Sequence, residues 1–214
     1  MEITNTPIQN YCDEHTLPES EVLNKLNRDT HANVLYPRML SGHFQGRLLS
    51  MLSKMIRPKV ILEIGTYTGY SAICLAEGLA ENGKLITIDV NVEQEQRVRK
   101  YIAEANMQNQ IQFIIGDALN IVKTLQYTYD LIFIDADKPN YAKYYDLVFD
   151  KLNKGGYIIA DNVLWSGKVV EEKEMIKDKD AQILDAFNKK IQQDERVENI
   201  LLPIRDGLMV VRKK

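Results

Sequence analysis

The chain has 214 residues, of which 45% are hydrophobic and 27% are charged, and its formal net charge is −3. This balance favours one globular domain with a sizeable core and lacks the basic excess of a nucleic-acid-binding protein. No run approaches the ~18 apolar residues of a membrane span. The polar, acidic start MEITNTPIQNYCDEH is unlike a secretory signal. We therefore expect neither nucleic-acid nor membrane partners.

Residues 1–57 are expected to be helical, because apolar residues recur at three-to-four-residue spacing over 20–34 and 45–56. Strands are then expected at 59–65, 83–90, 111–117, 129–135, 155–161, 197–204 and 207–213. Helices are expected at 70–81, 93–107, 118–125, 140–152 and 179–194. The alternation predicts an α/β fold with a mostly parallel seven-stranded sheet and helices on both faces. The short turn at 205–207 indicates one antiparallel strand.

The two cysteines form neither a disulfide framework nor a zinc-site spacing. Cys74 lies in the apolar run SAICLAEGLA and is expected in the core, while Cys12 lies near the start. This pattern is typical of a reducing cytoplasm. Because the chain has no repeat, low-complexity tract or Pro/Gly linker, we interpret residues 1–214 as one domain. Its helical segment, 1–57, is expected to cover the site of a cofactor-binding core, 58–214.

Ligands of parallel α/β sheets bind beyond the carboxyl ends of the strands, so the residues that follow each strand are the candidate site. The first strand leads into EIGTYTGYS at 63–71, where Gly65 and Gly69 permit a tight turn before a helix. The G-x-x-x-G spacing differs from the G-x-G-x-x-G of dinucleotide sites. Glu63 would repel a pyrophosphate and would suit a ligand with a cationic amino-acid end. An ordinary strand-to-helix turn is the alternative.

Carboxylates also follow the next two strands. Asp89 lies about 20 residues past the first turn, where an acid commonly binds ribose hydroxyls. Asp117 is placed either to accept a hydrogen bond from an adenine amino group or to cap the next helix, and capping is the better explanation for it alone. Together with Glu63, these carboxylates outline a nucleoside with a charged tail.

Hard oxygen ligands follow the fourth and fifth strands. Asp135-Ala136-Asp137-Lys138 follows the fourth, and Asp161-Asn162 follows the fifth. If these strands are neighbours, Asp135, Asp161 and Asn162 meet at one edge, and their oxygens suit Mg²⁺, Mn²⁺ or Ca²⁺ better than zinc. A solvated, salt-bridged strand end is the alternative for the first group, and a helix cap or turn for the second. Their occurrence at consecutive strand ends favours a metal site.

The ordered set LEIGTYTGYS, TIDVN, GDAL, FIDADKPNY, ADNVLWSG and DGLMVVRK resembles the cation-dependent O-methyltransferases that use S-adenosylmethionine. This group comprises the caffeoyl-CoA and catechol O-methyltransferases, including small bacterial members, and the likeness runs from about Met39 to the C-terminus. It implies a Rossmann-like class I methyltransferase and a homodimer. The implied reaction is divalent-cation-dependent methyl transfer to a phenolic hydroxyl of a catechol-like or hydroxycinnamoyl-type acceptor.

The resemblance also implies roles for the matching residues. The implied cofactor contacts are Glu63, Gly65, Ser71, Asp89, Asp117, Ala118, Asp135 and Asp137. The implied metal ligands are Asp135, Asp161 and Asn162, with Mg²⁺ or Mn²⁺ as the expected ion and Ca²⁺ as an alternative. Lys138 stands where catechol-type members carry the general base. The charged segment 164–179 falls where the family varies its substrate loop, with a solvated surface as the alternative.

The chain departs from the family pattern at Gln45-Gly46-Arg47, where a second glutamine usually follows the glycine. This departure concerns a substrate-side or packing contact rather than the chemistry. Two rival functions fit the residues less well. A nucleotide-dependent oxidoreductase is disfavoured by the missing G-x-G-x-x-G motif and by the acid before the turn. A non-catalytic adenosyl-cofactor-binding protein is disfavoured by Lys138 beside a full set of metal ligands.

Overall fold

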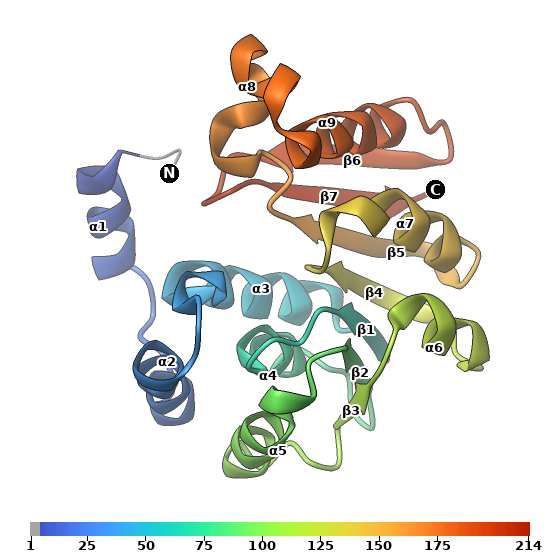
Figure 1. Cartoon of the computed structure of the whole chain (residues 1–214). Helices are drawn as coiled ribbons and strands as arrows, with labels where there is room; N and C mark the ends of the chain where they lie inside the picture. Colours follow the sequence, from blue (N-terminus) through green and yellow to red (C-terminus); the bar gives the residue numbers. More distant parts are fainter. Residues whose placement is uncertain (1–4) are drawn as a thin grey trace.

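The computed structural model describes residues 5–214, and its centre is one seven-stranded sheet with the strand order β3-β2-β1-β4-β5-β7-β6 (Figure 1). The strands are β1 (Val60–Ile64), β2 (Lys84–Asp89), β3 (Ile111–Ile115), β4 (Tyr129–Ile134), β5 (Leu152–Asp161), β6 (Val197–Leu202) and β7 (Leu208–Lys213). Strands β1 to β5 pair in parallel, and β7 is antiparallel to both of its neighbours, β5 and β6. The predicted mostly parallel sheet with one antiparallel strand is therefore confirmed.

The helices before the sheet are α1 (Thr6–Glu14), α2 (Glu21–Asn33) and α3 (Gly42–Ile56). Those within the sheet's connections are α4 (Tyr70–Ala76), α5 (Glu95–Glu104), α6 (Ala118–Thr124), α7 (Tyr141–Phe149), α8 (Glu172–Lys177) and α9 (Lys179–Gln192). Short 3₁₀ turns occur at η1 (Pro37–Met39), η2 (Val92–Gln94), η3 (Lys138–Asn140) and η4 (Trp165–Val170). None of the helices in this described part of the chain is long and apolar enough to cross a membrane.

The helix predicted over 70–81 is shorter than expected and ends at Ala76. The residues after it turn against α3. A Cβ on Gly78 would lie 2.2 Å from the carbonyl carbon of Ser53, so only glycine allows this close approach. The hydroxyl of Ser53 also donates a hydrogen bond to the carbonyl of Leu75 at 2.6 Å. Tertiary packing, rather than local helix propensity, therefore sets the end of α4.

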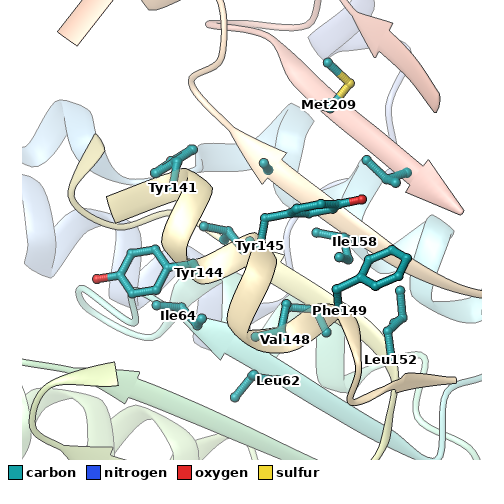
Figure 2. Close-up of a cluster of buried hydrophobic side chains, with 14 of the residues drawn as sticks. Leu62, Ile64, Tyr141, Tyr144, Tyr145, Val148, Phe149, Leu152, Ile158 and Met209 are labelled. Atoms are coloured by element: carbon teal, nitrogen blue, oxygen red, sulfur yellow. The ribbon is translucent and has the colours of Figure 1, made fainter. Parts of the chain in front are cut away.

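The core lies on both faces of the sheet, as predicted. On one face α6, α7 and α9 pack against inward side chains that include Leu62, Ile132 and Ile158 (Figure 2). On the other face, α3, α4 and α5 pack around residues such as Ile61 and Leu131. Burial on both faces explains why these strands are apolar almost throughout. Cys74 is buried in the second of these layers, as expected, and Cys12 and Cys74 are both free thiols.

The parallel register brings the carboxyl ends of the strands to one edge. Ile64 at the end of β1 pairs with Ile88 in β2 and with Ile134 in β4, and Ile134 pairs with Ala160 in β5. The residues that follow these positions therefore emerge side by side. The strand order reverses between β1 and β4, which is where ligands bind in open α/β sheets.

Candidate functional site

The loop between β1 and α4 is shaped by Gly65 and held by Asp89. Gly65 has φ 99°, and a Cβ there would lie 1.8 Å from the carbonyl oxygen of Asp135, so glycine alone lets the ends of β1 and β4 pass this closely. Asp89 Oδ2 accepts hydrogen bonds from the backbone N–H groups of Thr66 and Tyr67 at 2.9 and 2.7 Å. The structure thus brings together Gly65, Asp89 and Asp135, which come from three neighbouring strand ends.

Glu63 is fully buried within β1. Its Oε2 accepts a hydrogen bond from the Thr87 hydroxyl at 2.5 Å, whereas its Oε1 is buried with no hydrogen-bond partner among residues 5–214. Burial raises the pKa of Glu63 to about 8; the hydroxyls of Ser71 and Thr87 oppose this rise, and the carboxylates of Asp135 and Asp89 add to it. A buried carboxyl with one unpartnered oxygen is a favourable partner for a cationic ligand group.

The residues expected near an adenine lie farther along the same edge. Asp117 is exposed and caps α6, since its Oδ1 accepts from the N–H of Leu119 at 2.8 Å. Ala118 beside it is buried. Asp137 is also exposed, and its Oδ1 accepts a hydrogen bond from the Tyr144 hydroxyl at 2.6 Å. The hydrogen bonds of Asp117 and Asp137 are made with neighbouring residues of α6, η3 and α7, and both carboxylates face solvent rather than the buried loop.

A polar cluster lies at the ends of β4 and β5. Lys138 Nζ is 3.5 Å from Asp135 Oδ1 and 3.0 Å from Asn162 Oδ1. Asp161 is only 3% exposed, and its Oδ1 accepts a hydrogen bond from the N–H of Asn162 at 2.7 Å. Asn162 has φ 59°, a left-handed conformation that asparagine tolerates better than most residues. The structure therefore groups all four side chains that the sequence placed in a metal and base site.

The electrostatics of this cluster fit a hard divalent cation. Burial and the nearby Asp135 carboxylate together raise the pKa of Asp161 to about 7, against the lowering effects of Gln45 and Lys138. Two converging carboxylates and one amide oxygen are the donors that Mg²⁺ and Ca²⁺ prefer. No cluster of three or more His, Cys, Asp and Glu side chains suited to a metal occurs in residues 5–214. The third oxygen here is that of the Asn162 amide, and Lys138 Nζ lies beside Asp135 and Asn162.

Two further residues complete the cluster, and the sequence reasoning assigned neither a role in it. Gln45 of α3 is 1% exposed, and its Nε2 donates to Asp161 Oδ2 at 2.5 Å. Tyr141, the first residue of α7, is fully buried, donates from its hydroxyl to the Asp161 carbonyl at 2.9 Å and accepts from Lys138 Nζ at 2.6 Å. Burial, together with the charges of Asp135 and Asp161, raises the pKa of Tyr141 well above its usual range, so this hydroxyl stays protonated. Its only sequence signal is its position three residues after Lys138.

The departure at Arg47 is a helix-packing contact. Its guanidinium donates to both carboxylate oxygens of Glu77 at 2.9 and 3.0 Å and so joins α3 to α4. The neighbouring Gly46 lies where these helices approach most closely, because a Cβ there would be 2.5 Å from the Tyr70 ring and 2.9 Å from Cys74 Sγ. Of the two contacts left open by the sequence, the packing contact is the one that the structure has.

The segment 164–179 contains η4 and α8 and is tied to the start of α9. Asp178 Oδ2 accepts hydrogen bonds from Trp165 Nε1 at 3.1 Å and from Lys168 Nζ at 2.6 Å. Its Oδ1 accepts from the backbone N–H of Asp180 and so caps α9. Val170 is 80% exposed on the outer part of the segment. The segment is therefore anchored at its base beside β5 and exposed beyond it.

A cavity of about 690 Å³ lies elsewhere in the molecule. Its walls include Met55 of α3, Lys59 before β1, Asp130 of β4 and Lys154 of β5. Lys59 and Asp130 stand at the starts of their strands, opposite the edge that carries Asp135. This cavity therefore does not belong to the polar cluster.

Comparisons with known proteins agree on one family. The O-methyltransferase family matches residues 13–214. Caffeoyl-CoA O-methyltransferase 1 of Arabidopsis thaliana is 35% identical over 205 residues, which cover 91% of this chain and 79% of that protein. Caffeoyl-CoA O-methyltransferase 5 of Nicotiana tabacum is 34% identical over 205 residues, covering 91% and 85%.

Two solved structures are similar over nearly the whole chain. The SAH-bound methyltransferase of Podospora anserina has a TM-score of 0.89 at 28% identity, covering 97% of this chain and 94% of that one. The O-methyltransferase from Bacillus cereus in complex with SAH has a TM-score of 0.88 at 28% identity, covering 98% of both chains. The predicted class I methyltransferase fold agrees with both.

Proposed function

Because the chain belongs to the O-methyltransferase family, we propose that it transfers a methyl group from S-adenosylmethionine to a phenolic hydroxyl with the help of a divalent cation. The acceptor is catechol-like or hydroxycinnamoyl-type, in keeping with the caffeoyl-CoA O-methyltransferases among its relatives. The observation that carries the proposal is the grouping of Asp135, Asp161 and Asn162 with Lys138 beside the Asp89-held loop. The SAH bound to two similar structures supports the cofactor.

The cofactor lies along the loops that follow β1, β2 and β3. The unpartnered Oε1 of Glu63 receives the amino group of the methionine end. Asp89 binds the ribose hydroxyls while it holds the loop, because a carboxylate has about four lone-pair positions and the loop uses only some of them. The remaining contacts come from residues around the loop ends: Gly65, Ser71, Asp117, Ala118, Asp135 and Asp137.

The metal ligands are Asp135, Asp161 and Asn162. A phenol has a pKa near 10, so forming its phenolate at pH 7 costs roughly 4 kcal/mol. A bound Mg²⁺ or Mn²⁺, or Ca²⁺ as the alternative, stabilises that anion. Gln45 holds Oδ2 of Asp161 and the N–H of Asn162 holds Oδ1, so this carboxylate is oriented before any ligand arrives.

Lys138 takes the proton from the acceptor hydroxyl as a neutral amine. The O–H bond breaks, a new N–H bond forms, and the phenolate oxygen attacks the methyl carbon of the sulfonium. The C–S bond then breaks and leaves the methyl ether and S-adenosylhomocysteine, and the lysine returns its proton to solvent. Burial of Lys138, whose side chain is 11% exposed, keeps bulk water from competing for this proton.

The test measures transfer of a labelled methyl group to catechol, to phenol and to a dihydroxycinnamoyl thioester. We expect a chelator to abolish transfer, Mg²⁺ or Mn²⁺ to restore it, and acceptors with two adjacent hydroxyls to outperform phenol. Full activity in chelator, with trace metal excluded by elemental analysis, would contradict the cation. Nicotinamide-dependent oxidation instead of transfer would favour the oxidoreductase, and cofactor binding without turnover would favour a non-catalytic binding protein. The homodimer, the cytoplasmic location and the lack of nucleic-acid partners stay predictions.

A further inference from the structure

We propose that Tyr141 is the positioning residue for Lys138, and that its hydroxyl holds the amine in place independently of the residues that bind the cation. This inference rests on the proposed function, because it assigns a partner to the proposed base. It concerns a residue that neither the sequence motifs nor the family match assigns.

The hydroxyl of Tyr141 contacts the backbone at Asp161 and Ala136 as well as the Lys138 amine. Its single proton is donated to the backbone carbonyl of Asp161 at 2.9 Å. The oxygen can therefore only accept, and Lys138 Nζ donates to it at 2.6 Å. The Lys138 Nζ also lies 4.6 Å from the centroid of the Tyr141 ring. The amine is thus held by both the hydroxyl and the ring.

The position of this hydroxyl is fixed by the core. Tyr141 is fully buried at the start of α7, in the cluster that also contains Tyr145 (Figure 2). Its ring packs edge-on against Phe187 of α9, with centroids 5.5 Å apart and planes at 83°. Any displacement of the hydroxyl would disturb this packing, so the hydroxyl is a rigid anchor for the more flexible lysine.

The other polar partners of Lys138 cannot serve as this anchor. Asp135 Oδ1 at 3.5 Å and Asn162 Oδ1 at 3.0 Å are both oxygens that the proposed function gives to the cation. An oxygen whose lone pairs point at a divalent ion has less to offer an ammonium, and the two cations repel. Tyr141 has no such competing role. It is therefore the contact that keeps Nζ near the acceptor hydroxyl when the site is loaded.

The arrangement also suits the proton transfer. With one N–H directed to Tyr141, the positions on the nitrogen that face Asp135 and Asn162 in this structure become available to the acceptor oxygen when those two residues bind the cation. As the acceptor O–H bond breaks and an N–H bond forms, the amine becomes an ammonium and the acceptor a phenolate. Tyr141 accepts a hydrogen bond from either form of Lys138 and keeps its own proton throughout. Its contribution is therefore alignment of the base.

The test variant is Tyr141→Phe, which keeps the ring and removes only the oxygen. Its matched control is Tyr145→Phe. Tyr145 lies on the next turn of the same helix, is also fully buried and is edge-on to Phe187 at 6.4 Å, but its hydroxyl donates to Asp194 at 2.9 Å. Both changes delete one hydrogen bond donated by a tyrosine hydroxyl, and only Tyr141→Phe also deletes a hydrogen bond accepted from Lys138.

We expect Tyr141→Phe to lower the single-turnover rate of methyl transfer by about 10- to 100-fold, the effect of losing one hydrogen bond to a charged group. The acceptor KM and the S-adenosylmethionine Kd should hardly change. Tyr145→Phe should leave the rate unchanged while lowering Tm to a similar extent. Equal rates for the two variants would overturn the inference.

Two further readouts separate alignment of the base from general damage. With ring-substituted catechols of lower hydroxyl pKa, the loss of methyl-transfer rate caused by Tyr141→Phe should be smaller, because a more acidic acceptor depends less on a base. In a double-mutant cycle, Tyr141→Phe should have no further effect once Lys138 has been replaced by Met. A deficit that is equal for all acceptors, or that persists in the Lys138→Met background, would contradict the assignment.

The wild-type protein provides a measurement that does not depend on the variant folding. In ¹⁵N NMR, the Nζ protons of Lys138 should exchange with water far more slowly than those of the exposed Lys143, which donates to Asn140 at 2.9 Å. Equal exchange of the two amines would overturn the inference. Failure of the proposed function looks different, because wild-type protein with cofactor and metal would then methylate none of the acceptors.

Discussion

Replacing Asp161 with asparagine should stabilise the metal-free protein while abolishing the proposed metal-dependent methyl transfer. The pKa of the buried Asp161 carboxyl rises from its usual 3.8 to about 7 in the folded protein, because it is buried and lies near Asp135. Between these two values the folded chain holds a proton that the unfolded chain has released, so stability falls as the pH rises through this window. The full penalty applies above pH 7 and is on the order of 4 kcal/mol.

Asparagine removes the charge while keeping the shape of the side chain. Its Oδ1 can still accept from the N–H of Asn162, and Gln45 can turn its amide to pair with the new Nδ2. These hydrogen bonds become weaker, since neither has a charged acceptor any longer. The net gain in the free energy of unfolding should therefore be about 1–3 kcal/mol at pH 8, and it should shrink towards pH 5.

The assay is urea unfolding in chelator at pH 8, 6.5 and 5. Asp117→Asn is the control, because Asp117 is an exposed helix cap at which asparagine caps about as well. Excess Mg²⁺ should raise the stability of the wild type through binding and leave Asp161→Asn unchanged. The reasoning fails if Asp161→Asn is less stable than the wild type at pH 8 in chelator, or if its gain does not depend on pH.

Two other substitutions test the cofactor loop and the helix packing. Asp89→Ala should raise the Kd for S-adenosylmethionine by several-fold to a hundredfold, because hydrogen bonds to a charged group contribute ~1–3 kcal/mol. Unchanged affinity by calorimetry would remove Asp89 from the site. Gly46→Ala should lower the free energy of unfolding by about 1–3 kcal/mol, because its Cβ would lie 2.5 Å from the Tyr70 ring. An unchanged urea midpoint would mean that α3 and α4 can move apart without loss of stability.

The sheet could be predicted because its strands are marked locally. Residues such as Leu131 to Ile134 are buried on both faces, so each central strand is a nearly unbroken apolar run that ends in polar residues. Much of the site followed from the same logic. Parallel strands share an edge, so Asp135 and Asp161 could be expected to meet once β4 and β5 were taken as neighbours.

Contacts that depend on distant parts of the chain could not be predicted. Gln45 binds Asp161 across 116 residues, and nothing local distinguishes it from a surface glutamine. Helix α1 lies within residues 1–57, which were expected to be helical, but its bounds could not be predicted, because none of its residues is buried and it has no apolar face. In η4, Trp165, Ser166 and Gly167 all have positive φ, a run that local propensities disfavour. These features are set by tertiary contacts.

Helix α3 of the helical segment contributes a contact to the polar cluster. Arg205, in the turn between β6 and β7, donates to the carbonyls of Leu40 and Ser41 and so ties the start of α3 to the sheet. From the next turn of α3, Gln45 supplies the hydrogen bond to Asp161 Oδ2. Without α3, this buried carboxylate would lose a partner while still facing Asp135, and its charged form would become costlier to maintain. The proposed ligands come from the strands, but the charged form of Asp161 that a cation would need depends on the helix.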